Sequence, residues 1–240
     1  MQNGSQFTMA ANKYLQLVRA PNMFTAVTNV FTGYAAVGLP GPSAATIVLL
    51  AFSSVCLYTG GVVWNDYCDR DRDKIENPHR PLPSGKVSMA FALALVIGFV
   101  AMGVGLAAYV HPLGALMALV IVMLMALYNM ALKSVPFLGA INMGACRFCN
   151  VFLGACAVPL AYDKALPYAG IIMAWVIMIS LYSSREAKEP RLQNVVKVMI
   201  LMIPLIDGAF VASLTEPGLG LAVAAFAIPA WALSRWIYVT

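Results

Sequence analysis

Acidic side chains are concentrated in one short segment of this sequence, from Asn65 to Asp73. Asn65, Asp69 and Asp73 are four residues apart, and Asp66 directly follows Asn65. Residues three and four apart share a face of a helix, so this spacing predicts one acidic stripe. Like charges in such a stripe favour a bound cation, and carboxylate oxygens suit Mg²⁺, which proteins usually share with substrate phosphates. The alternative is a solvated segment in which the intervening arginines neutralise the acids.

A proline-rich pattern follows the acidic segment. It reads Asn77-Pro78-His79-Arg80-Pro81-Leu82-Pro83-Ser84-Gly85-Lys86. The run from Asn65 through Gly85 resembles the UbiA superfamily of intramembrane prenyltransferases, which carries an NDxxDxxxD motif followed by an N-x-x-R-P-x-P-x-G segment. Both patterns are unbroken here. Shorter matches to that family are Arg19-Ala20-Pro21-Asn22, Tyr128-Asn129 and Lys133.

The resemblance implies a reaction. Members of the family bind an isoprenyl diphosphate through Mg²⁺, ionise it to an allylic cation and add that cation to an acceptor, which is usually aromatic. Carried over to this sequence, the resemblance assigns Mg²⁺ binding to Asn65, Asp69 and Asp73 and makes Asp66 a helper or base. The chemistry is consistent, because metal ions and preorganised cations stabilise the negative charge of a departing diphosphate.

Cations and aromatic rings near these motifs are further candidates. Arg80 and Lys133 come from two neighbouring loops and suit the departing diphosphate. The ring faces of Trp64, Tyr67 and Tyr128 could shield a carbocation, but an aromatic belt at the membrane interface explains them equally well. The predicted catalytic residues are Asp66, Arg80, Tyr128 and Lys133, and the predicted substrate-binding residues are Arg19, Arg147, Arg185 and Lys188.

The second acidic motif, usually DxxxD in the family, is altered in this chain. The corresponding segment reads Tyr182-Ser183-Ser184-Arg185-Glu186-Ala187-Lys188-Glu189-Pro190-Arg191. Glu186 and Glu189 are three residues apart and could replace the aspartates as metal ligands on one helical face. Arg185 and Lys188 flank them, so the alternatives are a surface ion-pair cluster or direct binding of the diphosphate by these two cations.

Two ionisable residues, Arg147 and Asp207, lie within predicted membrane spans. Charges at that depth are costly and usually face a partner or a wet cavity. Three interpretations are open: Arg147 pairs with Asp207, Arg147 reaches the diphosphate, or Arg147 extends to the membrane surface.

The elements that must position these residues are membrane helices. The 240-residue chain is 61% hydrophobic and 10% charged, with a mean hydropathy of +0.81, whereas soluble domains are about 25% charged. These values exclude a disordered, secreted or soluble α/β protein. Unbroken apolar runs also exclude an outer-membrane barrel, whose strands alternate polar and apolar residues. The net charge of +5 needs no nucleic-acid partner, because basic residues collect in the cytosolic loops of membrane proteins.

Proline, glycine and charge clusters divide the chain into eight predicted spans, since a spanning helix needs roughly 20 mostly apolar residues. The spans are Asn22–Gly38, Ala44–Trp64, Met89–Val110, Leu113–Leu132, Phe137–Leu160, Ala165–Ser184, Val196–Leu214 and Leu219–Tyr238. We therefore expect an all-α, polytopic membrane protein. Residues 1–240 would form one transmembrane domain of two four-helix halves, about 1–132 and 133–240, around a central cavity open at the cytosolic face.

Basic residues are distributed unevenly between the two sides of these spans. Thirteen of the fifteen Lys and Arg lie at the termini or in loops on one side, and only Lys164 lies on the other. This asymmetry predicts that both termini face the cytosol, in the inner membrane if the organism is bacterial. The acidic segment then lies at the cytosolic surface, where a site could take a polar group from the cytosol and an apolar group from the membrane.

Several functions agree with these observations. Mg²⁺-dependent transfer of an isoprenyl group to an acceptor small molecule fits the motifs best. The altered second motif supports a non-catalytic relative that binds or moves a prenylated or aromatic metabolite. A terpene cyclase, or a transferase acting on a phosphorylated sugar, would use the same metal chemistry. CDP-alcohol phosphotransferases also cluster aspartates, but their Asp-Gly and Ala-Arg signature does not occur in this loop.

Overall fold

Helices make up all the regular structure that the computed structural model describes, which covers residues 13–38, 43–185 and 191–237. This follows from the composition, because backbone amides in lipid have no water to bond and must bond within a helix. The expected all-α fold is confirmed. In chain order the elements are α2 (Ala20–Ala36), α3 (Ala44–Glu76), α4 (Met89–Val110), α5 (Pro112–Met130), η1 (Leu132–Ser134), α6 (Pro136–Ala155), η2 (Pro159–Ala165), α7 (Leu166–Ser183), α8 (Arg191–Leu201), α9 (Ile203–Leu214), α10 (Pro217–Ala224) and α11 (Ala227–Leu233).

The apolar helices make this a multi-pass membrane protein. Six segments of the described chain are long and apolar enough to cross a membrane: Ala44–Glu76, Met89–Val110, Pro112–Met130, Pro136–Ala155, Asp163–Ser183 and Arg191–Leu214. α2 has 17 residues, and α10 and α11 together form a shorter apolar segment. The count of eight spans therefore stays a prediction.

Two helices extend beyond the predicted spans. The second span was predicted for Ala44–Trp64, and α3 continues as a helix to Glu76, so it carries the acidic segment beyond the apolar part of the chain as the stripe interpretation requires. The seventh span was predicted to begin at Val196, and α8 begins at Arg191. An apolar run marks the part of a helix that contacts lipid, so hydropathy alone does not give the full length of either helix.

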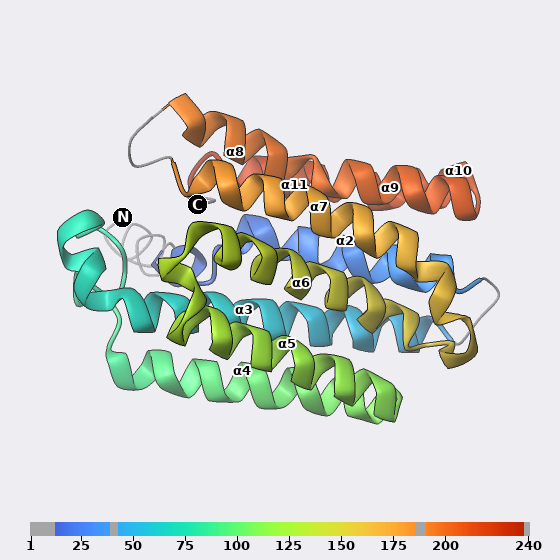
Figure 1. The fold of residues 1–240 in the computed structure, drawn as a ribbon, viewed down its shortest axis with the longest axis horizontal. Coiled ribbons are helices and arrows are strands. Elements are labelled where there is room, and N and C mark those ends of the chain that lie inside the picture. Colours follow the sequence, from blue (N-terminus) through green and yellow to red (C-terminus); the bar gives the residue numbers. More distant parts are fainter. Residues whose placement is uncertain (1–12, 39–42, 186–190, 238–240) are drawn as a thin grey trace, which may run out of the picture.

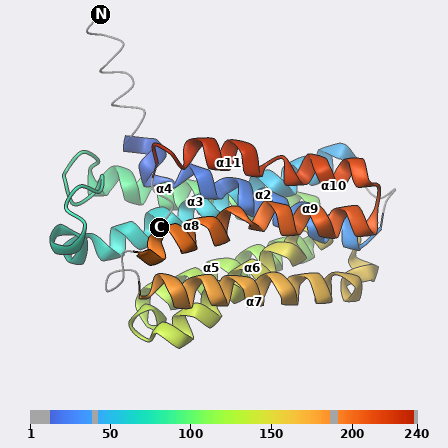
Figure 2. The same cartoon turned by 90° about the horizontal axis from the view of Figure 1, so that it is seen from above.

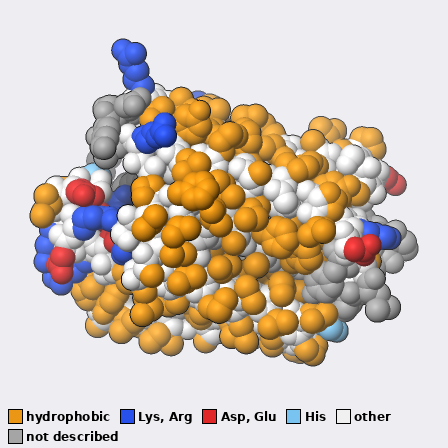
Figure 3. Space-filling view, in the orientation of Figure 1, with side chains coloured by type: hydrophobic (Ala, Val, Ile, Leu, Met, Phe, Trp, Pro, Cys, Tyr) orange, Lys and Arg blue, Asp and Glu red, His pale blue; other side chains and the backbone are white. Residues whose placement is uncertain are grey.

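The helices run roughly side by side along the long axis of the molecule (Figures 1 and 2). The α3–α4 and α5–α6 connections, the end of α7 and the start of α8 lie at one end, on the left in Figure 1. We call this the polar end. In the space-filling view, hydrophobic side chains cover the middle of the visible face, and charged side chains gather at its two ends (Figure 3). This distribution matches a protein that spans a bilayer.

Glycines bring the central helices into backbone contact. A Cβ atom at Gly33 of α2 would collide with the carbonyl oxygen of Val151, and one at Gly154 of α6 would collide with that of Val30. Without side chains at these two positions, α2 and α6 approach closely, as small residues allow in membrane helix pairs. This contact places α2, which begins at the polar end, directly beside α6.

Arg19 marks a sharp bend at the start of α2. Its backbone has φ 46° and ψ 55°, the left-handed conformation that non-glycine residues seldom adopt. Pro21 follows at the start of α2, where its fixed φ and missing N–H are tolerated. Strained residues of this kind persist where the surrounding structure holds them, often at functional sites.

Candidate active site

A cavity of about 830 Å³ opens at the polar end of the bundle. Its walls come from the start of α2, from α3, α5, α6, α7, α8 and α9, and from the loop that follows α3. The cavity-lining residues that were predicted from the sequence are Arg19, Asn65, Asp69, Arg80, Tyr128, Lys133 and Arg147. Residues from distant parts of the chain therefore meet in one space.

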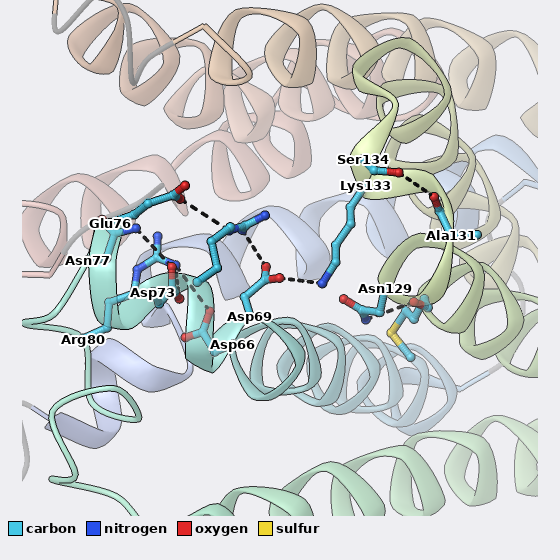
Figure 4. Close-up of polar contacts among 12 residues, drawn as sticks. Asp66, Asp69, Asp73, Glu76, Asn77, Arg80, Asn129, Ala131, Lys133 and Ser134 are labelled. Atoms are coloured by element: carbon cyan, nitrogen blue, oxygen red, sulfur yellow. Dashed lines mark hydrogen bonds and ion pairs between the residues drawn. The ribbon is translucent and has the colours of Figure 1, made fainter.

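One face of α3 supplies the acidic wall of this cavity. Asn65, Asp69, Arg72 and Glu76 line it at helical spacing, and α3 is a continuous helix through the acidic segment. Asp69 is only 4% exposed. It accepts a hydrogen bond at 2.8 Å from Arg72 and another from the ammonium group of Lys133 (Figure 4).

Asp66 and Asp73 of α3 are buried and are not among the residues that line the cavity. Asp73 is completely buried, and its carboxylate accepts hydrogen bonds from Arg80 at 2.8 Å and Asn77 at 3.1 Å (Figure 4). Asp66 is 1% exposed and accepts a hydrogen bond from Arg19 at 3.0 Å. The expected acidic stripe thus has two environments, because Asn65 and Asp69 line the cavity whereas Asp66 and Asp73 are buried in ion pairs with Arg19 and Arg80.

These ion pairs fix the cations that border the cavity. Asp66 holds Arg19, and both Asp66 and Asp73 lie within 4 Å of Arg80, at 3.9 and 2.8 Å. The side chains of Arg19 and Arg80 are 17% and 14% exposed, so little water screens these pairs. The proline-rich segment is therefore attached to α3 through Arg80, and the bend before α2 through Arg19.

Arg147 and Asp207 form no direct ion pair, so the structure does not support the first of the three open interpretations. Arg147 donates to Asn29 at 3.3 Å and to Thr25 at 2.9 Å, and Asp207 accepts from Asn29 at 2.8 Å. The amide of Asn29 lies between the two charges because α2 packs between α6 and α9. The interpretation that Arg147 reaches the diphosphate agrees with the structure, since Arg147 lines the cavity.

A narrower pocket of about 170 Å³ continues from the cavity into the bundle between α3, α5 and α6. The two spaces share the side chains of Arg19, Tyr58, Val62, Asn65, Tyr128, Met143 and Arg147. The deeper pocket is lined mainly by apolar side chains such as Leu57, Ile121 and Met125. A cationic and acidic mouth therefore leads into an apolar interior.

Among the aromatic candidates, only Tyr128 lies on the cavity wall. Trp64 and Tyr67 pack against apolar core residues. Tyr58 lines both spaces and its ring lies 5.4 Å from the Arg147 guanidinium, yet the sequence analysis missed it. Tyr58 precedes Asn65 by seven residues, which is about two helical turns, so both lie on the same face of the helix. This spacing could have identified Tyr58 from the sequence.

The wall opposite α3 carries neutral polar groups that the sequence analysis also missed. Ser180 and Ser183 of α7 and Gln193 of α8 line the cavity there. Arg185 is exposed and is not among the lining residues. The predicted candidates Glu186, Lys188 and Glu189 lie outside the described residues.

The donor set at α3 fits a hard divalent cation that is shared with a substrate. Asn65 and Asp69, an amide and a carboxylate side chain, line the cavity one helical turn apart. Mg²⁺ is usually bound by one or two carboxylates, with substrate phosphates and water completing its shell. Within the described ranges no three His, Cys, Asp or Glu side chains form a group that could hold a metal by itself.

Comparison with known sequences identifies relatives of this chain. The pattern that defines the UbiA prenyltransferase family matches residues 26–240. The digeranylgeranylglyceryl phosphate synthase of Methanococcoides burtonii is 34% identical over 161 residues, which are 64% of this chain and 57% of that protein. The protein of the same name from Ignicoccus hospitalis is 33% identical over 144 residues, which are 60% of this chain and 46% of that protein. The chain spans about half the length of the curated relatives it matches.

Solved structures share the fold. The structure of a UbiA homologue from Archaeoglobus fulgidus bound to GPP and Mg²⁺ matches with a TM-score of 0.63 at 19% sequence identity. The match covers 93% of this chain and 87% of the other. At this identity the likeness establishes the arrangement of helices.

Proposed function

Because the chain belongs to the UbiA prenyltransferase family, we propose that it transfers an isoprenyl group from its diphosphate to an acceptor within the cavity. One observation carries this proposal: the polar cavity leads into the apolar pocket, and the side chains of Arg147 and Tyr58 line both. An isoprenyl diphosphate has the same polarity, with an anionic head and an apolar tail. The head would lie in the mouth and the tail in the pocket.

Mg²⁺ would be held by Asn65 and Asp69, which line the cavity. When bound, the metal would neutralise charge on the diphosphate and make it a better leaving group. Asp73 would serve this site indirectly, because it is buried and fixes Arg80. Asp66 would act in the same way through Arg19.

Cations of this chain would bind the diphosphate and stabilise the charge that it gains on leaving. Lys133, Arg72 and Arg80 lie around Asp69 and Asp73 at the mouth, and Arg147 lies at the junction with the pocket. Preorganised cations in a partly dry site stabilise such charge strongly. The rings of Tyr58 and Tyr128 border the same junction, where their faces would stabilise an allylic cation and keep water away.

For the acceptor we propose a glyceryl phosphate lipid rather than the aromatic compound expected from the sequence. Relatives from several archaea are named digeranylgeranylglyceryl phosphate synthase. The Lys and Arg side chains that line the cavity are Arg19, Arg72, Arg80, Lys133 and Arg147, and a phosphorylated acceptor would give them a second anionic group to bind. The neutral wall of Ser180, Ser183 and Gln193 would bind its glycerol oxygens.

We also propose that the polar end faces the cytosol. Thirteen lysines and arginines lie on this side of the predicted spans and only Lys164 lies on the other. Loops rich in such residues are retained on the cytosolic side of the membrane. The diphosphate would then enter from the cytosol and the prenyl chain would lie between the helices.

A transfer assay tests the proposal. Purified protein in lipid nanodiscs would receive radiolabelled geranylgeranyl diphosphate with Mg²⁺, and either geranylgeranylglyceryl phosphate, an aromatic hydroxy acid, or no acceptor. We expect a prenylated lipid only with the glyceryl phosphate, and none when EDTA removes the metal. A product only with the aromatic acid would change the acceptor. A hydrocarbon without acceptor would indicate a cyclase, and binding without diphosphate release a non-catalytic relative.

The altered second motif can be examined in the same assay. If Glu186 and Glu189 bind a second metal, replacing both with Gln should abolish the response to Mg²⁺. If the cations bind diphosphate instead, Arg185→Ala and Lys188→Ala should weaken binding and the Gln pair should be tolerated. The difference is electrostatic, since removing a carboxylate near a diphosphate relieves repulsion unless a metal lies between them.

A further inference from the structure

A chain of buried polar groups crosses the bundle from α9 to the cavity. Asp207 is completely buried, and its two carboxylate oxygens accept hydrogen bonds from Asn29 and Thr32, each at 2.8 Å. Asn29 is also completely buried and donates to Asp207 through Nδ2 while its Oδ1 accepts from Arg147 at 3.3 Å. Asp207 lies outside the cavity wall, whereas Arg147 belongs to it.

We propose that Asp207 is a positioning residue that fixes the direction in which the Arg147 guanidinium enters the cavity. The proposal rests on the proposed function for its consequence, because Arg147 would there contact the diphosphate.

The amide of Asn29 transmits the effect. An amide has a donor on one side and an acceptor on the other. While Asp207 holds the NH₂ group of Asn29, the oxygen must point toward Arg147. Without the carboxylate the amide can reverse and present its NH₂ group to the guanidinium, which has only donors. The hydrogen bond to Arg147 would then be lost.

Charge balance acts in the same direction. A buried guanidinium at this depth needs a counter-charge or a wet cavity. Asp207 supplies the negative charge, with only the side-chain amide of Asn29 between its carboxylate and the guanidinium of Arg147. The guanidinium therefore remains on the side of the cavity next to α2. Thr25 at 2.9 Å and the Tyr58 ring complete its surroundings.

The position of Arg147 explains why its direction matters. It lines both the wide cavity and the apolar pocket, at the point where a diphosphate head would meet its prenyl tail. A guanidinium released from Asn29 could turn along the cavity and would no longer face that point. The expected result is weaker binding of the head group.

Chemical labelling tests the position of Arg147 without any substrate. Phenylglyoxal reacts with accessible guanidinium groups, and mass spectrometry of a chymotryptic digest reports the rate at Arg147. We expect slow modification in the parent protein and about tenfold faster modification in Asp207→Leu, since a hydrogen bond to a charged group is lost. Asn29→Ala should accelerate it similarly, and it carries the test if Asp207→Leu does not fold.

Asp207→Asn should keep the Arg147 guanidinium in the position that it has in the parent protein. The new amide can accept from Asn29 through its oxygen and donate to Thr32 through its nitrogen, so labelling should stay within about threefold of the parent. Ser53→Ala is the matched control, because Ser53 joins α3 to α4 by a buried hydrogen bond at 2.6 Å to Gly103 and does not line the cavity. It should leave the labelling rate unchanged.

A double-mutant cycle tests whether Asp207 affects diphosphate binding through Arg147. Titration of geranylgeranyl diphosphate should give about tenfold weaker binding in Asp207→Leu, and no further loss when Asp207→Leu is added to Arg147→Gln. Unchanged labelling and affinity in folded Asp207→Leu, or losses that multiply in the double variant, would overturn the proposal. If the parent bound no isoprenyl diphosphate, the proposed function would fail, while the labelling rates would still decide the role of Asp207.

Discussion

Lys133 donates a hydrogen bond to the carboxylate of Asp69 although 64 residues separate them in the chain. Lys133 lies in η1, between α5 and α6, and Asp69 lies on α3. The contact closes one side of the cavity and joins the acidic wall to the α5–α6 connection (Figure 4). It also places the ammonium group of Lys133 next to the proposed metal ligand, where a diphosphate would accept its hydrogen bond instead.

Replacing Lys133 with Gln should therefore affect turnover more than folding. The variant keeps a hydrogen-bonding side chain but loses the charge, and we expect kcat for prenyl transfer to fall by about 100-fold, the loss typical of one preorganised stabilising group. Lys74→Gln is the control, because Lys74 forms an exposed pair with Asp71 at 2.8 Å. Comparable activity in both variants would remove Lys133 from the site.

Asp69 and Asp73 should respond differently to the same substitution. Asp69→Asn removes a carboxylate from the cavity wall, and we expect Mg²⁺-dependent diphosphate binding to weaken by about 100-fold with little loss of stability. Asp73→Asn leaves Arg80 partly buried without its nearest counter-charge, which should cost about 3 kcal/mol of folding stability. Thermal unfolding in detergent and metal titration separate the two effects. Identical behaviour of the variants would contradict the division of the acidic stripe.

The depth of the apolar pocket should depend on Met125. This side chain is 8% exposed and lines the pocket, whereas Met123 on the same helix is 58% exposed. Met125→Ala should lengthen the pocket and shift the preference toward longer isoprenyl diphosphates. Met123→Ala removes the same atoms from the outer surface and should leave the preference unchanged. Competition between diphosphates of different chain length measures the shift, and equal preferences would place the tail elsewhere.

Close contact between α2 and α6 should make Gly33 intolerant of substitution. A Cβ atom there meets the backbone of Val151, which cannot move aside as a flexible side chain can. Gly33→Ala should lower the stability by about 1–3 kcal/mol or more, as overpacking does. Gly170→Ala on α7 meets no atom within 4 Å and should be neutral or slightly stabilising. Melting temperatures in one detergent provide the comparison.

Membrane orientation can be tested by cysteine labelling from outside intact cells. Ser84 and Ser184 follow α3 and α7 at the polar end, and Ser43 precedes α3 at the opposite end. In a Cys68→Ser background, which removes the exposed native thiol, Cys at Ser43 should react. Cys at Ser84 or Ser184 should react only after the membrane is made permeable. The reverse pattern would invert the proposed topology.

Sequence alone determined the class of protein and half of its acidic site. Long apolar runs require helices, because lipid offers no other partner to the backbone. The four-residue spacing of Asn65 and Asp69 placed both on one face wherever α3 lay in the bundle. Such features are local, so each can be predicted from a few neighbouring residues.

Tertiary structure decided which way the remaining groups face. Asp66 and Asp73 point toward Arg19 and Arg80, and Asn29 lies between Arg147 and Asp207. Helices that are apolar on all sides carry no stripe that fixes their rotation. Their rotation follows from how α2, α6 and α9 pack together, and this packing chose the partner of each buried charge.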